Sequence, residues 1–304
     1  MIEVDSNFEG GAVKRLTIVN NSIIFDAPLS GSPRGMWFYF RIKGGKDQVL
    51  TCIQNNIDNM LNGAYTNVRP VKREGEDGEW TRIPSDQIIW RNCPKTFGFN
   101  VKPKSDETYL AFSYPYTRTN IKKLIAELSS YSFVKVKKVG NTQEGRELKA
   151  LIIGKNDSTQ KKLVVGTARH HSGEVSSSYV VEGIIKKLLS GDKLSKWWLN
   201  NVILVLFPAV DLDGVVNGRY GKNRPPIDMN RDWGFSPVHD EVKAASDYID
   251  ELATQHDYSV FCDFHAPNPA DPSFLVPPHP LVLNDSARQE ISNFAAEFEK
   301  QSQS

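Results

Sequence analysis

The chain has 304 residues, of which 39% are hydrophobic and 24% are charged. This length exceeds what one compact core usually takes, so we expect two domains. With 37 basic and 36 acidic residues, the formal net charge is +1, which offers no long-range attraction for nucleic acid or for an anionic membrane.

Other features indicate the cellular compartment. No stretch approaches the roughly 18–20 continuous apolar residues of a membrane helix. The first residues are acidic where a signal peptide needs basic and then apolar ones. Three scattered cysteines are too few for a disulfide framework or a cysteine-built zinc site (Cys52, Cys93 and Cys262). The sequence therefore predicts a soluble, cytoplasmic protein with reduced cysteines.

Residues 14–112 consist of short apolar segments separated by Gly, Pro, Asn and Asp, which is typical of an antiparallel β-sandwich. The predicted strands are 15–19, 23–25, 36–42, 48–53, 67–71, 79–83, 87–90, 96–101 and 109–112. The aromatic run 37–40 is either a binding face or core, and aromatic residues on a sandwich strand are more often core. We expect an all-β antiparallel sandwich domain over residues 1–112.

The pattern changes after residue 116. Apolar residues at helical spacing predict helices over 120–128, 175–189, 239–254 and 285–301. Strands are predicted at 148–153, 162–165, 201–210 and 258–264. This alternation predicts an α/β domain over residues 113–304, with helices on both faces of a sheet. In such sheets, ligand sites lie just past the carboxyl ends of the strands.

Candidate metal ligands follow two of these strands. His171 and Glu174 are three residues apart at the start of a helix, so both side chains can converge on one point. Imidazole and carboxylate oxygen are good zinc ligands, although the pair alone also fits a loop histidine and a helix-start acid. His170 competes with His171 for the role. No His-Glu-x-x-His motif is present.

A third ligand can come from His265, directly after the strand 258–264 and at the same expected edge of the sheet. His256 precedes that strand and should lie at the opposite edge. Asp263 lies two residues before His265, on the same strand face, and can orient a metal-binding imidazole.

A long loop rich in Gly and Pro, residues 211–233, carries three arginines (Arg219, Arg224 and Arg231). Arginine binds a carboxylate through two parallel hydrogen bonds, and the neighbouring Asn230 can add a donor. Considered alone, these are ordinary solvated loop residues.

Taken in chain order, these motifs resemble the M14 family of zinc carboxypeptidases. The turn 140–146 (GNTQEGR) resembles the one that opens the catalytic domain of that family. The preceding sandwich, with its Trp-Phe-Tyr-Phe run and the Tyr114-Pro-Tyr junction, looks like the N-terminal domain of the cytosolic carboxypeptidase branch.

The resemblance implies one Zn²⁺ bound by His171, Glu174 and His265. It also implies that Asn230 and Arg231 bind the terminal carboxylate of a peptide or protein substrate. Arg219 would polarise the scissile carbonyl and hold the oxyanion, with Arg224 as the rival.

The sequence departs from the family in two loop positions and after His265. Ser172 replaces a proline, and Asp211-Leu replaces Asn-Pro ahead of Asp-Gly. The glutamate general base of the family follows the last zinc ligand at a distance, and the acidic residues there fit a solvated helix face (Glu290, Glu297 and Glu299). We expect an incomplete catalytic domain with severely reduced turnover, and the general base downstream of Ser304.

The sequence thus predicts a zinc-dependent metallocarboxypeptidase that hydrolyses the C-terminal peptide bond of peptides or protein tails. The alternatives are a zinc amidase or deacylase on small acylated amino acids, a non-catalytic protein that binds peptide C-termini, and a structural sandwich protein without metal. No nucleic acid or membrane partner is expected, and the sequence carries no signal of an oligomeric state.

Overall fold

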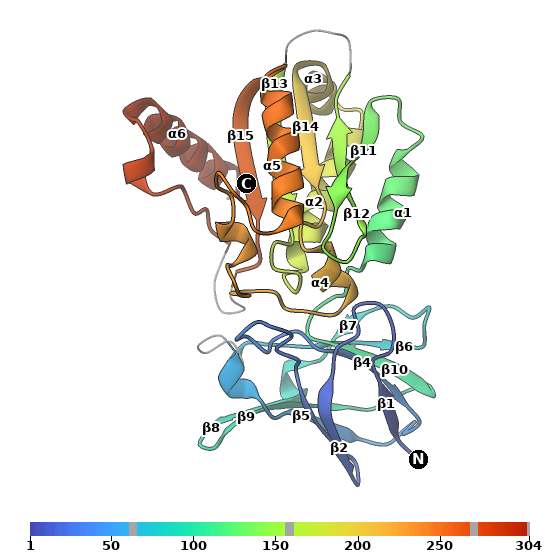
Figure 1. The fold of residues 1–304 in the computed structure, drawn as a ribbon. Coiled ribbons are helices and arrows are strands. Elements are labelled where there is room, and N and C mark those ends of the chain that lie inside the picture. Colours follow the sequence, from blue (N-terminus) through green and yellow to red (C-terminus); the bar gives the residue numbers. More distant parts are fainter. Residues whose placement is uncertain (61–65, 156–160, 268–272, 303–304) are drawn as a thin grey trace. The chain divides into compact units, whose positions relative to one another are not determined.

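The structure is a computed structural model that describes residues 1–60, 66–155, 161–267 and 273–302 (Figure 1). Residues Met1–Ala266 form one compact unit and Pro267–Ser304 a second. Among the described residues, none of the helices combines the length and the apolar content needed to cross a bilayer. The domain boundary predicted between residues 112 and 113 stays a prediction.

The N-terminal part contains two five-stranded sheets. In spatial order, the strands of the first are β1 (Glu3–Asp5), β4 (Tyr39–Lys43), β10 (Glu107–Ala111), β6 (Val71–Glu74) and β7 (Thr81–Arg82). Those of the second are β2 (Lys14–Val19), β3 (Ser22–Asp26), β5 (Leu50–Gln54), β9 (Lys95–Val101) and β8 (Ile88–Asn92). Short 3-10 turns are η1 (Ile57–Asn59) and η3 (Ser85–Gln87).

The predicted strand-rich domain is confirmed, but some strands differ from the prediction, and the one expected at 67–71 begins only at Val71. β3 and β5 run parallel, whereas the other pairs of these described strands are antiparallel. β1 was not predicted, because Glu3–Asp5 contains one apolar residue between two acids.

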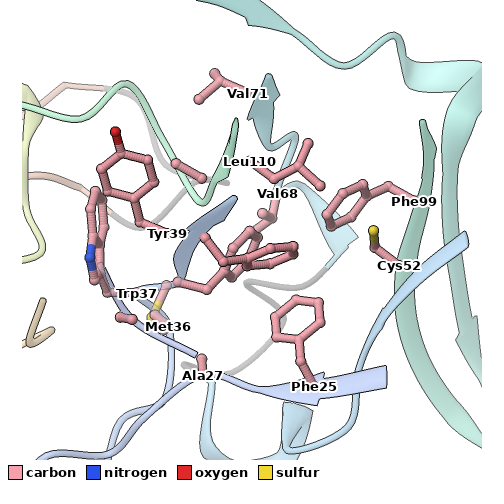
Figure 2. Packing of buried hydrophobic residues seen from close by; sticks show 14 of the residues in the cluster. Phe25, Ala27, Met36, Trp37, Tyr39, Cys52, Val68, Val71, Phe99 and Leu110 are labelled. Atoms are coloured by element: carbon pink, nitrogen blue, oxygen red, sulfur yellow. The ribbon is translucent and has the colours of Figure 1, made fainter. Parts of the chain in front are cut away.

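The aromatic run 37–40 lies in the core and not on a binding face. Trp37 and Tyr39 are 4% and 6% exposed, and the indole of Trp37 donates to the carbonyl of Gly10 at 3.0 Å. Figure 2 shows both rings within the cluster that also contains Phe25 and Phe99. The run is buried on both sides, because each of its faces packs against other parts of the chain.

The second half of the first unit has a mixed sheet of five strands. In spatial order they are β11 (Val134–Asn141), β12 (Glu147–Ile153), β14 (Val202–Phe207), β13 (Lys162–Ala168) and β15 (Asp257–Phe264). β13 runs parallel to β14 and β15, and β12 runs antiparallel to β11 and β14. The carboxyl ends of the three parallel strands therefore meet at one edge, as predicted.

Helices cover both faces of this sheet (Figure 1). Every residue of β14 is buried, and alternate side chains point to opposite faces. Val205 and Phe207 pack in the cluster with α5 (Asp240–Ala253), and Leu204 and Leu206 pack on the other face. That second cluster contains residues of α1 (Arg118–Leu128), α2 (Ser176–Leu189) and α3 (Lys193–Asn201).

Some elements of this half differ from the prediction. Residue 201 ends α3 instead of starting a strand, and β11, α3 and α4 (Leu212–Val216) were not predicted. The second unit holds η5 (Pro280–Val282) and α6 (Asp285–Ser302), close to the predicted helix 285–301.

The loop after β14 is bound to two loops of the sandwich. The backbone N–H of Gly10 donates to the carbonyl of Val216 at 2.8 Å, and the hydroxyl of Ser32 donates to the carbonyl of Lys222. Gly218 has a φ of +64°, and a Cβ there would lie 2.7 Å from the carbonyl oxygen of Gly10. The close approach therefore requires glycine at this position.

Candidate metal centre

The loop after β13 positions the first two predicted ligands. It folds around the guanidinium of Arg169, which is 2% exposed and donates to the carbonyl of Ser172 at 2.8 Å and to the hydroxyl of Ser178 at 2.9 Å. Arg169 has a φ of 59°, a conformation that is costly for a residue other than glycine. These bonds fix the loop, so that His171 and Glu174 face each other.

His171, Glu174 and His265 come together, as predicted from their strand ends. One potential ligand atom from each residue lies within 4.8 Å of the others. Nδ1 of His171 is 2.9 Å from Oε1 of Glu174, and Nδ1 of His265 is 2.7 Å from Oε2. The His171 and Glu174 side chains are each 2% exposed and that of His265 is 28% exposed, so solvent reaches the cluster from the His265 side.

Two imidazoles and a carboxylate are the donor set that a catalytic zinc ion takes in proteins, with a further position left for water or substrate. The three residues therefore fit Zn²⁺, and both histidines would bind through Nδ1.

Hydrogen bonds within the cluster shift its pKa values. Burial acts to raise the pKa of the Glu174 carboxyl, but hydrogen bonds from His171 and His265 outweigh it and hold that pKa below its usual range. Burial acts to lower the pKa of His265, yet hydrogen bonds to Asp263 and Glu174 raise it to about 9. Without metal, protons thus lie on the hydrogen bonds between the imidazole nitrogens and the Glu174 carboxylate. A divalent cation bound by these atoms would release those protons.

A carboxylate lies behind each candidate histidine ligand. Asp228 accepts from Nε2 of His171 at 3.0 Å, and Asp263 accepts from Nε2 of His265 at 2.6 Å. Such carboxylates fix the ring orientation and tautomer of metal-binding histidines. The contact predicted for Asp263 is present, whereas Asp228 was missed. The only signal for it in the sequence is its place just ahead of Asn230, whose backbone N–H it caps at 3.1 Å.

His170, the rival of His171, lies on the far side of Asp263. Its Nδ1 is 2.8 Å from Oδ1 of Asp263, and its Nε2 accepts from the indole of Trp233 at 2.9 Å. Both ring nitrogens are therefore engaged away from Glu174. His256 precedes β15 and lies at the opposite end of that strand, as predicted.

The two residues predicted to bind a substrate carboxylate, Asn230 and Arg231, lie on the 3-10 turn η4 (Met229–Arg231), and Asn230 contacts the cluster. The Asn230 amide nitrogen is 3.2 Å from Nε2 of His265. Oδ1 of Asn230, an acceptor, is buried and has no hydrogen-bond partner among the described residues. Arg231 is exposed.

The remaining cations of the long loop differ in their contacts. Arg219 pairs with Glu144 at 2.9 Å, and Arg224 lies 3.6 Å from Asp211, which is almost fully buried. Lys222 contacts the cluster directly, because its Nζ lies 3.3 Å from Oε1 of Glu174.

The turn 140–146 is bound to the start of the long loop through Asp213. This buried carboxylate accepts from the hydroxyl of Thr142 at 2.7 Å, from the backbone N–H of Glu144 at 2.9 Å and from Arg146 at 2.5 Å. The two motifs thus form one structural unit, although 69 residues separate Glu144 from Asp213.

Comparison with known proteins gives the same family in both halves. The family described as zinc carboxypeptidase matches residues 121–265, and the cytosolic carboxypeptidase N-terminal domain matches residues 4–113. The chain is 26% identical to cytosolic carboxypeptidase 6 of Mus musculus over 251 residues, which cover 75% of this chain and 46% of the relative. For cytosolic carboxypeptidase 6 of Homo sapiens, the identity is 26% over 288 residues, covering 86% and 56%.

The chain therefore spans about half the length of these curated relatives. Among solved structures, a metallo-carboxypeptidase from Burkholderia cenocepacia has the same fold, with a TM-score of 0.78, 24% identity and coverage of 88% of this chain and 72% of that one. The two family matches together cover most of the sandwich and the α/β sheet, up to and including His265. The chain belongs to the M14 zinc carboxypeptidase family, in its cytosolic carboxypeptidase branch.

Proposed function

We propose that the protein is a zinc-dependent metallocarboxypeptidase that acts on the C-terminal peptide bond of peptides or protein tails. The family and the fold support hydrolysis at peptide C-termini. The observation that carries the proposal is the convergence of His171, Glu174 and His265, with their ligand atoms within 4.8 Å of one another, at the edge where three parallel strands end.

In this proposal, His171, Glu174 and His265 hold one Zn²⁺. The bound ion supplies Lewis acidity to the scissile carbonyl and lowers the pKa of a bound water from about 15.7 towards 7. Asp228 and Asp263 keep the two imidazoles oriented, with Nδ1 of each ring directed at the cluster. The exposed edge of His265 leaves one side of the site open to substrate.

Arg231 and Asn230 select a chain end. The guanidinium of Arg231 is solvent-exposed, so it is free to form two parallel hydrogen bonds with a terminal carboxylate. The Nδ2 group of Asn230, which is a donor, would add a further hydrogen bond to that carboxylate. Because only a chain end carries a free α-carboxylate, this grip makes the proposed enzyme an exopeptidase.

The role of Arg219 as the oxyanion residue stays a prediction. Arg219 would have to exchange its ion pair with Glu144 for the substrate, and Arg224 would have to leave the vicinity of Asp211. Comparing kcat for Arg219→Ala and Arg224→Ala separates them, because removing an oxyanion donor typically costs about 10²–10³-fold in kcat. We assign no residue of this chain as the general base.

The test is a zinc-loaded assay of the full chain on two peptides of the same sequence, one with a free C-terminal carboxylate and one with a C-terminal amide. Over a long incubation, mass spectrometry should find a slow loss of one C-terminal residue from the free acid, because no general base is assigned in this chain, and no change in the amide. Arg231→Ala should raise KM for the free acid, and His171→Ala should abolish both zinc binding and cleavage.

Other outcomes identify the alternatives. Zinc-dependent binding of the free acid without any released residue would make the protein a non-catalytic binder of peptide C-termini. Cleavage of small N-acyl amino acids in preference to peptides would make it an amidase or deacylase.

A cytoplasmic location is proposed on two grounds: the names of the relatives and the three free cysteines.

A further inference from the structure

His170 is a fully buried histidine that the proposed reaction does not use. It is 0% exposed, and both of its ring nitrogens have partners. Nδ1 lies 2.8 Å from Oδ1 of Asp263, and Nε2 lies 2.9 Å from the indole nitrogen of Trp233. A buried imidazole with two specific partners, next to a candidate metal site, requires an explanation.

The direction of each hydrogen bond follows from the chemistry of Trp233. An indole N–H can only donate, so Nε2 of His170 must accept and therefore carries a lone pair. The ring proton must then sit on Nδ1, which donates to the carboxylate of Asp263. Trp233 thus selects the tautomer of His170.

Asp263 connects this histidine to the candidate ligand His265. Its Oδ1 accepts from His170 and from the hydroxyl of Thr167 at 2.9 Å, and its Oδ2 accepts from Nε2 of His265 at 2.6 Å. These three hydrogen bonds hold the carboxylate in one orientation.

We propose that His170 is a positioning residue for the metal site, one that fixes Asp263 so that His265 directs Nδ1 at the ion. The hydrogen-bonded series Trp233–His170–Asp263–His265 would then set the zinc affinity without any contact between His170 and the metal. This inference rests on the proposed metal site and adds to it two residues, His170 and Trp233, that do not bind the ion themselves.

The same residues suggest a competing arrangement, a second metal bound by His170, Asp263 and His265, whose donor atoms also lie within 4.8 Å of one another. For that, Nδ1 of His170 would need a lone pair, and the proton would move to Nε2. There it would face the N–H of Trp233, donor against donor. The geometry therefore favours one metal per chain, and a second equivalent of bound zinc would overturn the inference.

The test measures zinc affinity by competition with a chelator on the full chain. His170→Phe removes the donor to Asp263 but keeps the ring volume, and we expect it to weaken zinc binding about 10–100-fold, the usual effect of losing a group behind a metal ligand. His170→Gln retains an N–H donor and should recover part of the loss. Trp233→Phe should give a smaller loss.

A double-mutant cycle separates positioning from general destabilisation. In an Asp263→Ala background, adding His170→Phe should leave zinc affinity unchanged, because the connection to His265 is already broken. Additive losses would contradict the inference. His239 is a matched control: it is 2% exposed and hydrogen-bonded to Asp232 at 2.8 Å. His239→Phe should lower the unfolding temperature without changing zinc affinity.

The outcomes distinguish this inference from the proposed function. If the parent chain binds one zinc that is lost in His171→Ala, while His170→Phe binds zinc as tightly as the parent, the positioning role is wrong and the metal site stands. If the parent binds no zinc, the metal site itself is wrong.

Discussion

Replacing Glu174 by glutamine keeps the size of a central side chain and removes its charge. Besides its contact with Lys222, the carboxylate has hydrogen bonds at 2.9 Å to His171 and 2.7 Å to His265, and these two lose their charge assistance. Because the amide has only one oxygen, one of the two rings must accept from the new N–H instead of donating. A hydrogen bond to a charged group contributes about 1.5–3 kcal/mol and a neutral one about 0.5–1.5 kcal/mol, so the two exchanges cost about 2–3 kcal/mol. The amide is easier to bury than the carboxylate, which offsets part of this cost.

We therefore expect metal-free Glu174→Gln to unfold only a few degrees below the metal-free parent, at about 2–4 °C per kcal/mol. Zinc should separate the two proteins much further. A ligand at 1,000 times its Kd stabilises the folded state by about 4.1 kcal/mol, which corresponds to about 8–16 °C by the same conversion. The parent should show this rise, whereas the variant, which lacks the anionic ligand, should show little of it.

Differential scanning calorimetry of chelator-treated protein, with and without added zinc, measures both effects. Glu182→Gln is the matched control: it makes the same substitution at a residue of α2 whose ion pair is with Lys186. The control should retain the full rise of the parent. An equal zinc-induced rise in Glu174→Gln and in the parent would refute the assignment of Glu174 as a ligand.

Three further perturbations test other parts of the structure. Asp228→Asn removes the carboxylate behind His171 and should weaken zinc binding about 10–100-fold in chelator competition; parent-like affinity would contradict its orienting role. Arg146→Ala leaves the buried carboxylate of Asp213 without its cation and should lower the free energy of unfolding by about 3 kcal/mol. This is the lower end of the range for a buried ion pair, because Arg146 is one-fifth exposed. Denaturant unfolding measures the change, and a value near zero would show that the ion pair does not stabilise the fold. Burial raises the pKa of Glu241, and the charge of Asp213 adds to this shift. The protonated side chain therefore stabilises the fold below pH 4.5, and this contribution to stability is lost as the pH rises through the raised pKa. Glu241→Gln should therefore be more stable than the parent at pH 7, with the difference vanishing near pH 4; an equal difference at both pH values would contradict the shift.

The sequence predicted those features that depend on local periodicity. The strand 258–264 and the helix 239–254 match β15 and α5 to within a residue, because both have clear apolar patterns and polar boundaries. The convergence of His171, Glu174 and His265 followed from one topological rule, that parallel strands end at the same edge of a sheet.

Features that depend on long-range packing were missed. Two of the four apolar residues of α3, Leu194 and Trp197, are exposed, so its apolar pattern does not mark the buried face. The start of the helix is marked mainly by Asp192, whose carboxylate accepts from the N–H of Ser195 at 2.7 Å. Asp228 is 57 residues from His171, and the backbone N–H of Asn223 donates to it at 2.7 Å. No spacing rule connects residues that distant, since their contact depends on the path of the whole loop.

The role of His170 could not be predicted from spacing either. In the sequence it was a rival for the metal, because adjacent histidines in a loop cannot be ranked by spacing. Its partners Asp263 and Trp233 are 93 and 63 residues away. Only their positions in the fold reveal that both of its ring nitrogens are engaged.

The bond from Ser32 to the carbonyl of Lys222 connects the N-terminal sandwich to a residue of the candidate metal centre. Lys222 contacts Glu174 through its ammonium group and the sandwich through its backbone, so a substitution in the N-terminal domain can shift a group at the candidate metal centre. The sandwich and the candidate metal centre are thus linked through the backbone and the side chain of one residue, Lys222.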